Sequence, residues 1–132
     1  MVQKRKTVDQ LLSDARARLA RLGPEQAKRA LEDGALLIDI RSDSQRAHDG
    51  LMPGAKVVPR NELEWLLDPD CDYRDPELAR PEAQVVIVCN TGYQSSLVAA
   101  NLKDMGFERA TDVDGGFRAW REAGLPVEKP LP

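Results

Sequence analysis

Short apolar runs alternate along this chain with segments of helical periodicity. The apolar runs are ALLIDI (35–40), AKVVP (55–59), VVIV (85–88) and RATDV (109–113). The helical segments that precede, separate and follow them are 24–33, 42–49, 61–67, 95–105 and 117–123. Strands that alternate with helices favour a parallel sheet joined by right-handed crossovers. We therefore predict an α/β fold, with a central parallel sheet of about five short strands and helices on both faces.

The N-terminal residues precede this alternating pattern and form an extension of their own. Residues 7–22 carry apolar side chains at helical spacing, and Thr7 with Gln10 matches a capping box. We expect one amphipathic helix over 7–22, whose apolar face packs on its own domain or forms a homodimer contact. The chain then divides into three parts, which are a helical extension (1–22), one α/β domain (23–127) and a tail (128–132).

Composition limits the partners that such a chain would bind. Nineteen basic and 22 acidic residues give a net charge of −3, and no basic patch interleaved with aromatic residues predicts nucleic-acid binding. No apolar run approaches the ~20 residues of a membrane span, so we expect no membrane partner. The two cysteines, Cys71 and Cys89, form neither a CxxC pair nor a metal-ligand pattern. We expect free thiols in a reducing cytoplasm, and no metal site.

Cys89 stands directly after the most apolar of the predicted strands. The run Val85–Val88 ends at this cysteine, a short polar loop follows, and helical spacing resumes near residue 95. In an open α/β sheet, ligands bind beyond the carboxyl ends of the strands, where this loop is expected. Gly92 lets a short loop curl, and successive N–H groups in such a curl form an anion-binding nest beside a helix N-terminus. A thiol held there favours its thiolate form.

These features make Cys89 a candidate nucleophile cradled by backbone amides. We expect the loop amides to bind an anion, with help from the Gln94 side chain and the hydroxyls of Ser95 and Ser96. The predicted anion-binding residues of the loop are Asn90, Thr91, Gly92, Tyr93, Gln94 and Ser95. The alternative reading of the same spacing is a buried structural cysteine at the end of a strand.

Four motifs, in this order along the chain, resemble the single-domain rhodaneses, a family of sulfurtransferases. The segment LLIDIR (36–41) is similar to a strand that ends in D-x-R, and GLMPGAKVVP (50–59) is similar to a G-H-I-P-G-A segment with Leu51 in place of histidine. The loop CNTGYQS (89–95) resembles the family's C-x-x-G-x-R pattern, and VDGGFRAWREAGLPV (113–127) matches its glycine- and tryptophan-containing run. The resemblance covers residues 23–127 and leaves the N-terminal extension outside.

This resemblance implies a rhodanese-like fold and persulfide chemistry. In such proteins a cysteine thiolate takes the outer sulfur of a donor such as thiosulfate, becomes a persulfide, and passes the sulfur to a thiophilic acceptor such as cyanide or a thiol. Cys89 would be the catalytic residue. The implied partners are a small anionic sulfur donor and its acceptor, and no cofactor is implied.

The loop departs from the family pattern at Gln94, where the pattern has arginine. Loss of a positive charge weakens both stabilisation of a thiolate and binding of a dianionic donor. We therefore expect weak activity, a less charged donor, or a cation from elsewhere in the chain. Arg60 is our candidate for that cation, because it follows the predicted strand at 55–59 and should lie on the same edge as Cys89.

The missing arginine keeps a second class of function open. The chain could be a non-catalytic rhodanese-like module that binds a partner or senses an anion or an oxidant. In the oxidant-sensing case, Cys89 would form a sulfenic acid and pair with Cys71. A phosphatase is disfavoured, since the related dual-specificity phosphatases use a longer loop closed by an arginine that grips phosphate.

Overall fold

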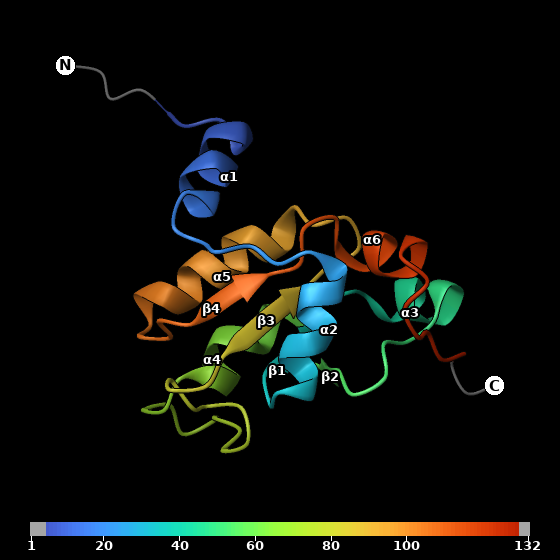
Figure 1. Cartoon of the computed structure of the whole chain (residues 1–132). Helices are drawn as coiled ribbons and strands as arrows, with labels where there is room; N and C mark the ends of the chain where they lie inside the picture. Colours follow the sequence, from blue (N-terminus) through green and yellow to red (C-terminus); the bar gives the residue numbers. More distant parts are fainter. Residues whose placement is uncertain (1–4, 130–132) are drawn as a thin grey trace.

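Four parallel strands form the central sheet of this protein, whose computed structural model describes residues 5–129 (Figure 1). The strands are β1 (Leu36–Asp39), β2 (Lys56–Val57), β3 (Val85–Val88) and β4 (Ala110–Asp112). They are ordered β2-β1-β3-β4, and every neighbouring pair is parallel. A single parallel bridge joins Leu22 to Val113 at the end of β4. The predicted α/β sheet is therefore confirmed, with four strands and one bridge where about five strands were expected.

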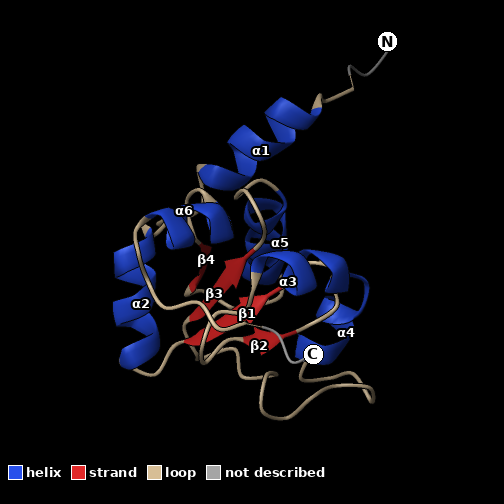
Figure 2. Cartoon of the chain, turned by 90° about the vertical axis from the view of Figure 1, so that its right-hand side faces the viewer, coloured by secondary structure: helices blue, strands red, loops and turns tan. Residues whose placement is uncertain are grey.

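Helices cover both faces of this sheet. They are α1 (Val8–Arg16), α2 (Pro24–Glu32), α3 (Asp43–Asp49), α4 (Leu63–Leu67), α5 (Gln94–Asp104) and α6 (Gly116–Glu122). In Figure 2, α2 and α6 lie on one side of the sheet, and α4 and α5 lie on the other. The helix expected from residue 61 begins instead as a 3₁₀ turn, η1 (Arg60–Glu62), and no side chain caps the start of either η1 or α4. Within residues 5–129, no helix has the length and apolar character needed to cross a membrane.

The two faces of the sheet bury different side chains. Ile38 and Ile87 belong to a core cluster with residues of α4 and α5, whereas Leu37 and Val86 belong to a cluster with residues of α2 and α6. Burial on both faces explains why β3 is apolar throughout. Since β3 lies between β1 and β4, Cys89 follows a strand end in the middle of the edge where α/β sheets bind ligands.

The helix predicted over residues 7–22 is half as long as expected. Thr7 and Gln10 form the predicted capping box, but α1 ends at Arg16. The backbone after it follows the open edge of β4, where the Leu22 amide donates to the Asp112 carbonyl at 3.0 Å. The edge of β4 offers hydrogen bonds that a continued helix would leave unmade, and this is why the prediction was wrong.

Candidate active site

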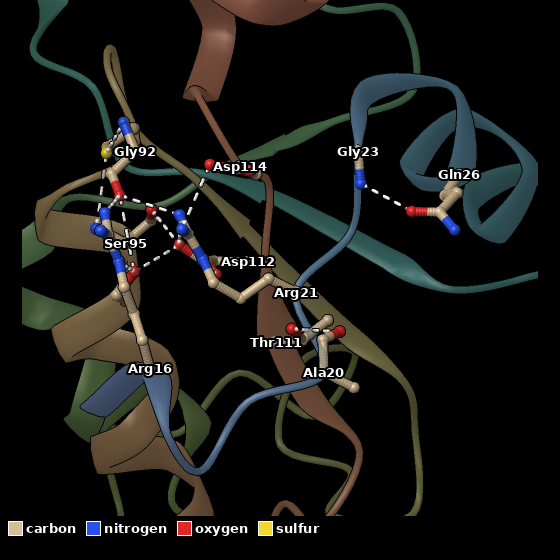
Figure 3. A network of polar contacts seen from close by, with 12 residues as sticks. Arg16, Ala20, Arg21, Gly23, Gln26, Gly92, Ser95, Thr111, Asp112 and Asp114 are labelled. Atoms are coloured by element: carbon tan, nitrogen blue, oxygen red, sulfur yellow. Dashed lines mark hydrogen bonds and ion pairs between the residues drawn. The ribbon is translucent and has the colours of Figure 1, made fainter. Parts of the chain in front are cut away.

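Cys89 is the first residue of the loop that joins β3 to α5. Its residue surface is 6% exposed, and its Sγ accepts hydrogen bonds from the amide of Gly92 at 3.1 Å and the amide of Ser95 at 3.4 Å (Figure 3). Two backbone donors aimed at one sulfur stabilise a negative charge on it. Cys89 is also a member of the apolar core cluster under α4 and α5, so the two amides contact a sulfur that is otherwise buried.

The carbonyl groups of the loop are held on its outer side. The amide of Phe117 donates to the Cys89 carbonyl at 2.8 Å, and the amide of Arg118 donates to the Asn90 carbonyl at 3.1 Å. The Gly92 carbonyl accepts from the guanidinium groups of Arg16 and Arg21. In a trans peptide the N–H points opposite to the C=O, so these outer contacts turn the following amides inward.

The inner side of the loop has amides available for an anion. Gly92 has φ +86°, and Tyr93 has right-handed helical angles, an alternation of hand that is typical of an anion-binding nest. The amides of Tyr93 and Gln94 donate to no acceptor within residues 5–129. The side chains of Tyr93 and Gln94 are exposed, whereas Asn90 and Thr91 are half-buried and Ser95 is buried.

Behind the loop, the buried carboxylate of Asp112 accepts hydrogen bonds from the hydroxyls of Ser95 and Ser96. Asp112 at the end of β4 is 0% exposed, and its Oδ2 accepts from Ser95 Oγ at 2.7 Å and Ser96 Oγ at 2.8 Å. Arg21 Nε donates to the other oxygen, Oδ1, at 2.9 Å. The two hydroxyls expected to assist an anion are thus committed to Asp112. Sequence reasoning missed Asp112, although an acidic residue ending a buried strand beside β3 was a usable signal.

A cavity of about 780 Å³ opens beside the loop at Gln94. Most of the residues that line it are polar or charged, and they include Ser42, Gln45, Arg46, Arg60 and Asn61. Cys89 is not part of the lining, so Gln94 is the residue that connects the loop to this cavity. Arg60 therefore lies on the same side of the sheet edge as the loop, where its guanidinium pairs with Glu64 at 2.8 Å.

A smaller hollow of about 380 Å³ lies on the other side of Gln94. Its lining combines α1 with the start of α5, through Val8, Leu12, Tyr93 and Leu97 among others. The N-terminal extension therefore contributes to the surface around the loop.

Of the remaining polar and reactive side chains, Arg41 also lines the cavity beside Gln94. His48 is exposed on α3 and its ring bonds to Asp49 at 2.7 Å. Cys71 is a free, half-buried thiol in the long loop after α4. Asp39 and Arg41 at the end of β1 form a buried ion pair at 2.8 Å. Neither His48 nor Cys71 makes a hydrogen bond to the Cys89 loop among the described residues.

A family model for the rhodanese-like domain matches residues 23–123. The chain belongs to this family. The matched region includes the Cys89 loop and the turn before α6, whereas α1 and the segment that follows it lie outside. The resemblance drawn from four sequence motifs is thereby confirmed.

Two curated rhodanese-like relatives carry the name thiosulfate sulfurtransferase GlpE. The protein from Pseudomonas syringae is 34% identical over 101 residues, which cover 76% of this chain and 86% of the relative. The protein from Actinobacillus pleuropneumoniae is 32% identical over 108 residues, which cover 81% of this chain and 91% of the relative.

Two solved structures are similar over most of the chain. A protein of unknown function from Rhodopseudomonas palustris, described as a possible tyrosine phosphatase, has a TM-score of 0.86 at 30% identity over 97% of this chain and 99% of that chain. The polysulfide-sulfur transferase homodimer from Wolinella succinogenes has a TM-score of 0.69 at 28% identity. The match covers 88% of this chain and 82% of that chain. A match over 97% of the chain includes most of the N-terminal extension.

Proposed function

We propose that this protein is a rhodanese-type sulfurtransferase that carries sulfane sulfur as a persulfide on Cys89. The observation that supports this most directly is the pair of backbone amides, of Gly92 and Ser95, that donate to Cys89 Sγ. The same donors that stabilise a thiolate stabilise an anionic persulfide, because both carry their charge on sulfur. The names of the curated relatives agree with this chemistry.

The first half-reaction loads the cysteine. The Cys89 thiolate attacks the outer sulfur of thiosulfate, a new S–S bond forms, and the S–S bond of thiosulfate breaks. Sulfite leaves with the bonding electron pair, and the single negative charge of the thiolate passes to the terminal sulfur of the persulfide. The amides of Tyr93 and Gln94, which have no acceptor within the described chain, are our candidates for holding that terminal sulfur.

The second half-reaction unloads the sulfur. Cyanide or a thiolate attacks the terminal sulfur, the Cys89 S–S bond breaks, and Cys89 Sγ keeps the electron pair as a thiolate. The products are thiocyanate or a small persulfide. The Gly92 and Ser95 amides receive the returning charge without rearrangement, since they already donate to this atom.

The cavity beside Gln94 is the proposed route for the anionic donor. Arg46 and Arg60 line it and provide positive charge, although Arg60 also pairs with Glu64 and Arg46 with Asp43. Arg60 in this proposal draws the donor toward the loop and does not contact the sulfur. The exposed side-chain amide of Gln94 can donate neutral hydrogen bonds to the anion at the point where thiosulfate would enter.

The N-terminal helix presents apolar side chains to solvent. Val8 and Leu11 on α1 are exposed, so the proposed quaternary state is a monomer or a homodimer formed through this helix. Light scattering during size exclusion would distinguish the two. A reducing cytoplasm is the proposed location, because the chemistry requires Cys89 as a free thiol.

Intact-protein mass spectrometry after incubation with thiosulfate tests the function. The wild type and Cys71→Ser should gain about 32 Da, and cyanide should remove the adduct as thiocyanate, whereas Cys89→Ser should gain nothing. The Cys71→Ser variant is the matched control for removal of a thiol. A wild type that takes up no sulfur, or an adduct that persists in Cys89→Ser, would overturn the proposal. Absence of sulfur transfer with turnover of p-nitrophenyl phosphate would indicate a phosphatase instead.

A further inference from the structure

Two arginines from outside the family-matched region converge on the loop that carries Cys89. Arg16 Nη2 donates to the Gly92 carbonyl at 2.8 Å, and Arg21 Nη2 donates to the same oxygen at 3.1 Å (Figure 3). Arg16 is the last residue of α1, and Arg21 belongs to the extended segment beside β4. Hydrogen bonds from charged donors are stronger than neutral ones, so two of them hold the Gly92 carbonyl firmly in place.

We propose that Arg16 and Arg21 are positioning residues of the sulfur-carrying loop and supply the positive charge that the loop lacks at Gln94. This inference rests on the proposed function of Cys89 and extends it to the N-terminal extension. Both guanidinium groups act through the Gly92 peptide from the outer side of the loop.

The first part of the role is orientation. Because the peptide after Gly92 is trans, an oxygen held outward by two arginines turns the Tyr93 amide inward. The Gly92 amide already points at Cys89 Sγ, so the two amides share one concave side. Arg16 also lies over the Tyr93 ring, 5.6 Å from its centroid, which restrains the next residue of the loop.

The second part of the role is neutralisation. The Asp112 carboxylate is buried behind the loop, where it fixes the hydroxyl of Ser95, whose amide donates to Cys89 Sγ. An unpaired buried carboxylate this close would disfavour an anion on the sulfur. Arg21, whose side chain is 17% exposed, pairs with Asp112 and removes that effect. Arg16 then adds a further positive charge at the loop, beside Ser96 Oγ at 3.1 Å.

Other charged groups near the loop do not reverse this balance. Asp114 also pairs with Arg21, at 3.2 Å, but its side chain is 71% exposed and therefore screened by solvent. On the β1 side, Asp39 and Arg41 neutralise each other. Burial lowers the pKa of Arg21, but the hydrogen bond and charge of Asp112, with the charges of Asp114 and Cys89, raise it above its ordinary value. Arg21 is therefore a permanent cation.

The test compares substitutions of the three arginines in a Cys71→Ser background, where alkylation reports on Cys89 alone. Arg16→Gln, Arg21→Gln and the double variant remove the loop contacts, and Arg21→Lys keeps the charge. Arg18→Gln is the matched control, because Arg18 belongs to the same segment but contacts Asp104 at 2.6 Å on the surface. The measurements are the pH profile of iodoacetamide alkylation, the rate of sulfur uptake from thiosulfate, and the melting temperature.

The double variant should shift the midpoint of the alkylation profile upward by about one pH unit and slow sulfur uptake at neutral pH about tenfold. Arg18→Gln should leave both unchanged, and Arg21→Lys should recover part of the shift. If Arg21→Gln does not fold, the inference is tested with Arg16→Gln alone, because this variant leaves the Arg21–Asp112 ion pair intact. Folded Arg16→Gln with an alkylation profile and uptake rate equal to wild type would overturn the inference.

The two proposals fail in different ways. A wild type that takes up no sulfur would refute the proposed function, while the alkylation profiles would still decide whether Arg16 and Arg21 tune Cys89. Normal sulfur uptake in the wild type, together with an alkylation profile and uptake rate of folded Arg16→Gln equal to wild type, would refute only the inference.

Discussion

The amide of Phe117 donates to the carbonyl oxygen of Cys89 at 2.8 Å, which fastens the N-terminus of α6 directly to the candidate nucleophile. This contact requires a very close approach of the two backbones. A Cβ placed on Gly116 would lie 2.5 Å from the Cys89 oxygen and 2.8 Å from the Gly92 nitrogen. A glycine at the start of α6 is thus required for this close approach of α6 to the loop.

Gly116→Ala should therefore damage the loop more than an ordinary glycine substitution. Gly116 has φ +61°, and Gly106, with φ +95°, has open space around it, so Gly106→Ala is the matched control. Both changes incur the cost of a left-handed backbone, about 1 kcal/mol. Gly116→Ala should lose at least about 2 kcal/mol more in urea denaturation and slow sulfur uptake, because backbone must move. Equal effects of the two substitutions would contradict this.

Asp112→Asn should destabilise the fold markedly. The change leaves the guanidinium of Arg21 without its buried partner and weakens the acceptor for Ser95 and Ser96. We expect a loss of about 2–4 kcal/mol in the free energy of unfolding, measured by urea denaturation. Asp114→Asn removes the exposed partner of the same arginine and should cost below about 1 kcal/mol. A comparable loss in both variants would show that burial of Asp112 is not the source of the effect.

Gln94→Arg should raise the rate of sulfur uptake from thiosulfate. Gln94 is exposed between the two hollows beside the loop, so the longer side chain has room and its charge would face an incoming dianion. We expect a gain of about three- to tenfold in single-turnover experiments. Gln94→Met, whose side chain is about as long as that of glutamine and carries no charge, should give no gain. A rate unchanged by arginine would mean that charge at this position does not limit donor binding.

The ion pair between Arg18 and Asp104 should contribute to stability in a pH-dependent way. Its hydrogen bond and charge hold the pKa of Asp104 below the ordinary value of 3.8. A lowered folded-state pKa means that the contribution is complete above that value and is lost as the pH falls through the lowered one. Melting temperatures of the wild type and Arg18→Gln should differ at about pH 6 and converge once the pH falls below the lowered pKa of Asp104. A difference that persists in acid would exclude this pair as its cause.

Local sequence patterns determined much of the fold. The apolar run before Cys89 predicted β3, the capping box at Thr7 placed the start of α1, and Pro24 placed the start of α2. The glycine in the loop and the helix directly after it predicted a cysteine surrounded by amides. Each of these features depends on neighbours a few residues apart, so the pattern of side chains was enough to find them.

Tertiary structure decided where the charge behind the loop comes from. Arg16 and Arg21 lie 76 and 71 residues from Gly92 along the chain, and Arg21 lies 91 residues from Asp112. No local periodicity joins such residues, and periodicity favoured a helix through residue 22 that would have turned Arg21 elsewhere. The open edge of β4 redirected that segment, because its unpaired backbone groups form hydrogen bonds only with an extended chain. The sequence by itself singled out Cys89 as the candidate nucleophile, and the sheet edge decided which arginines contact its loop.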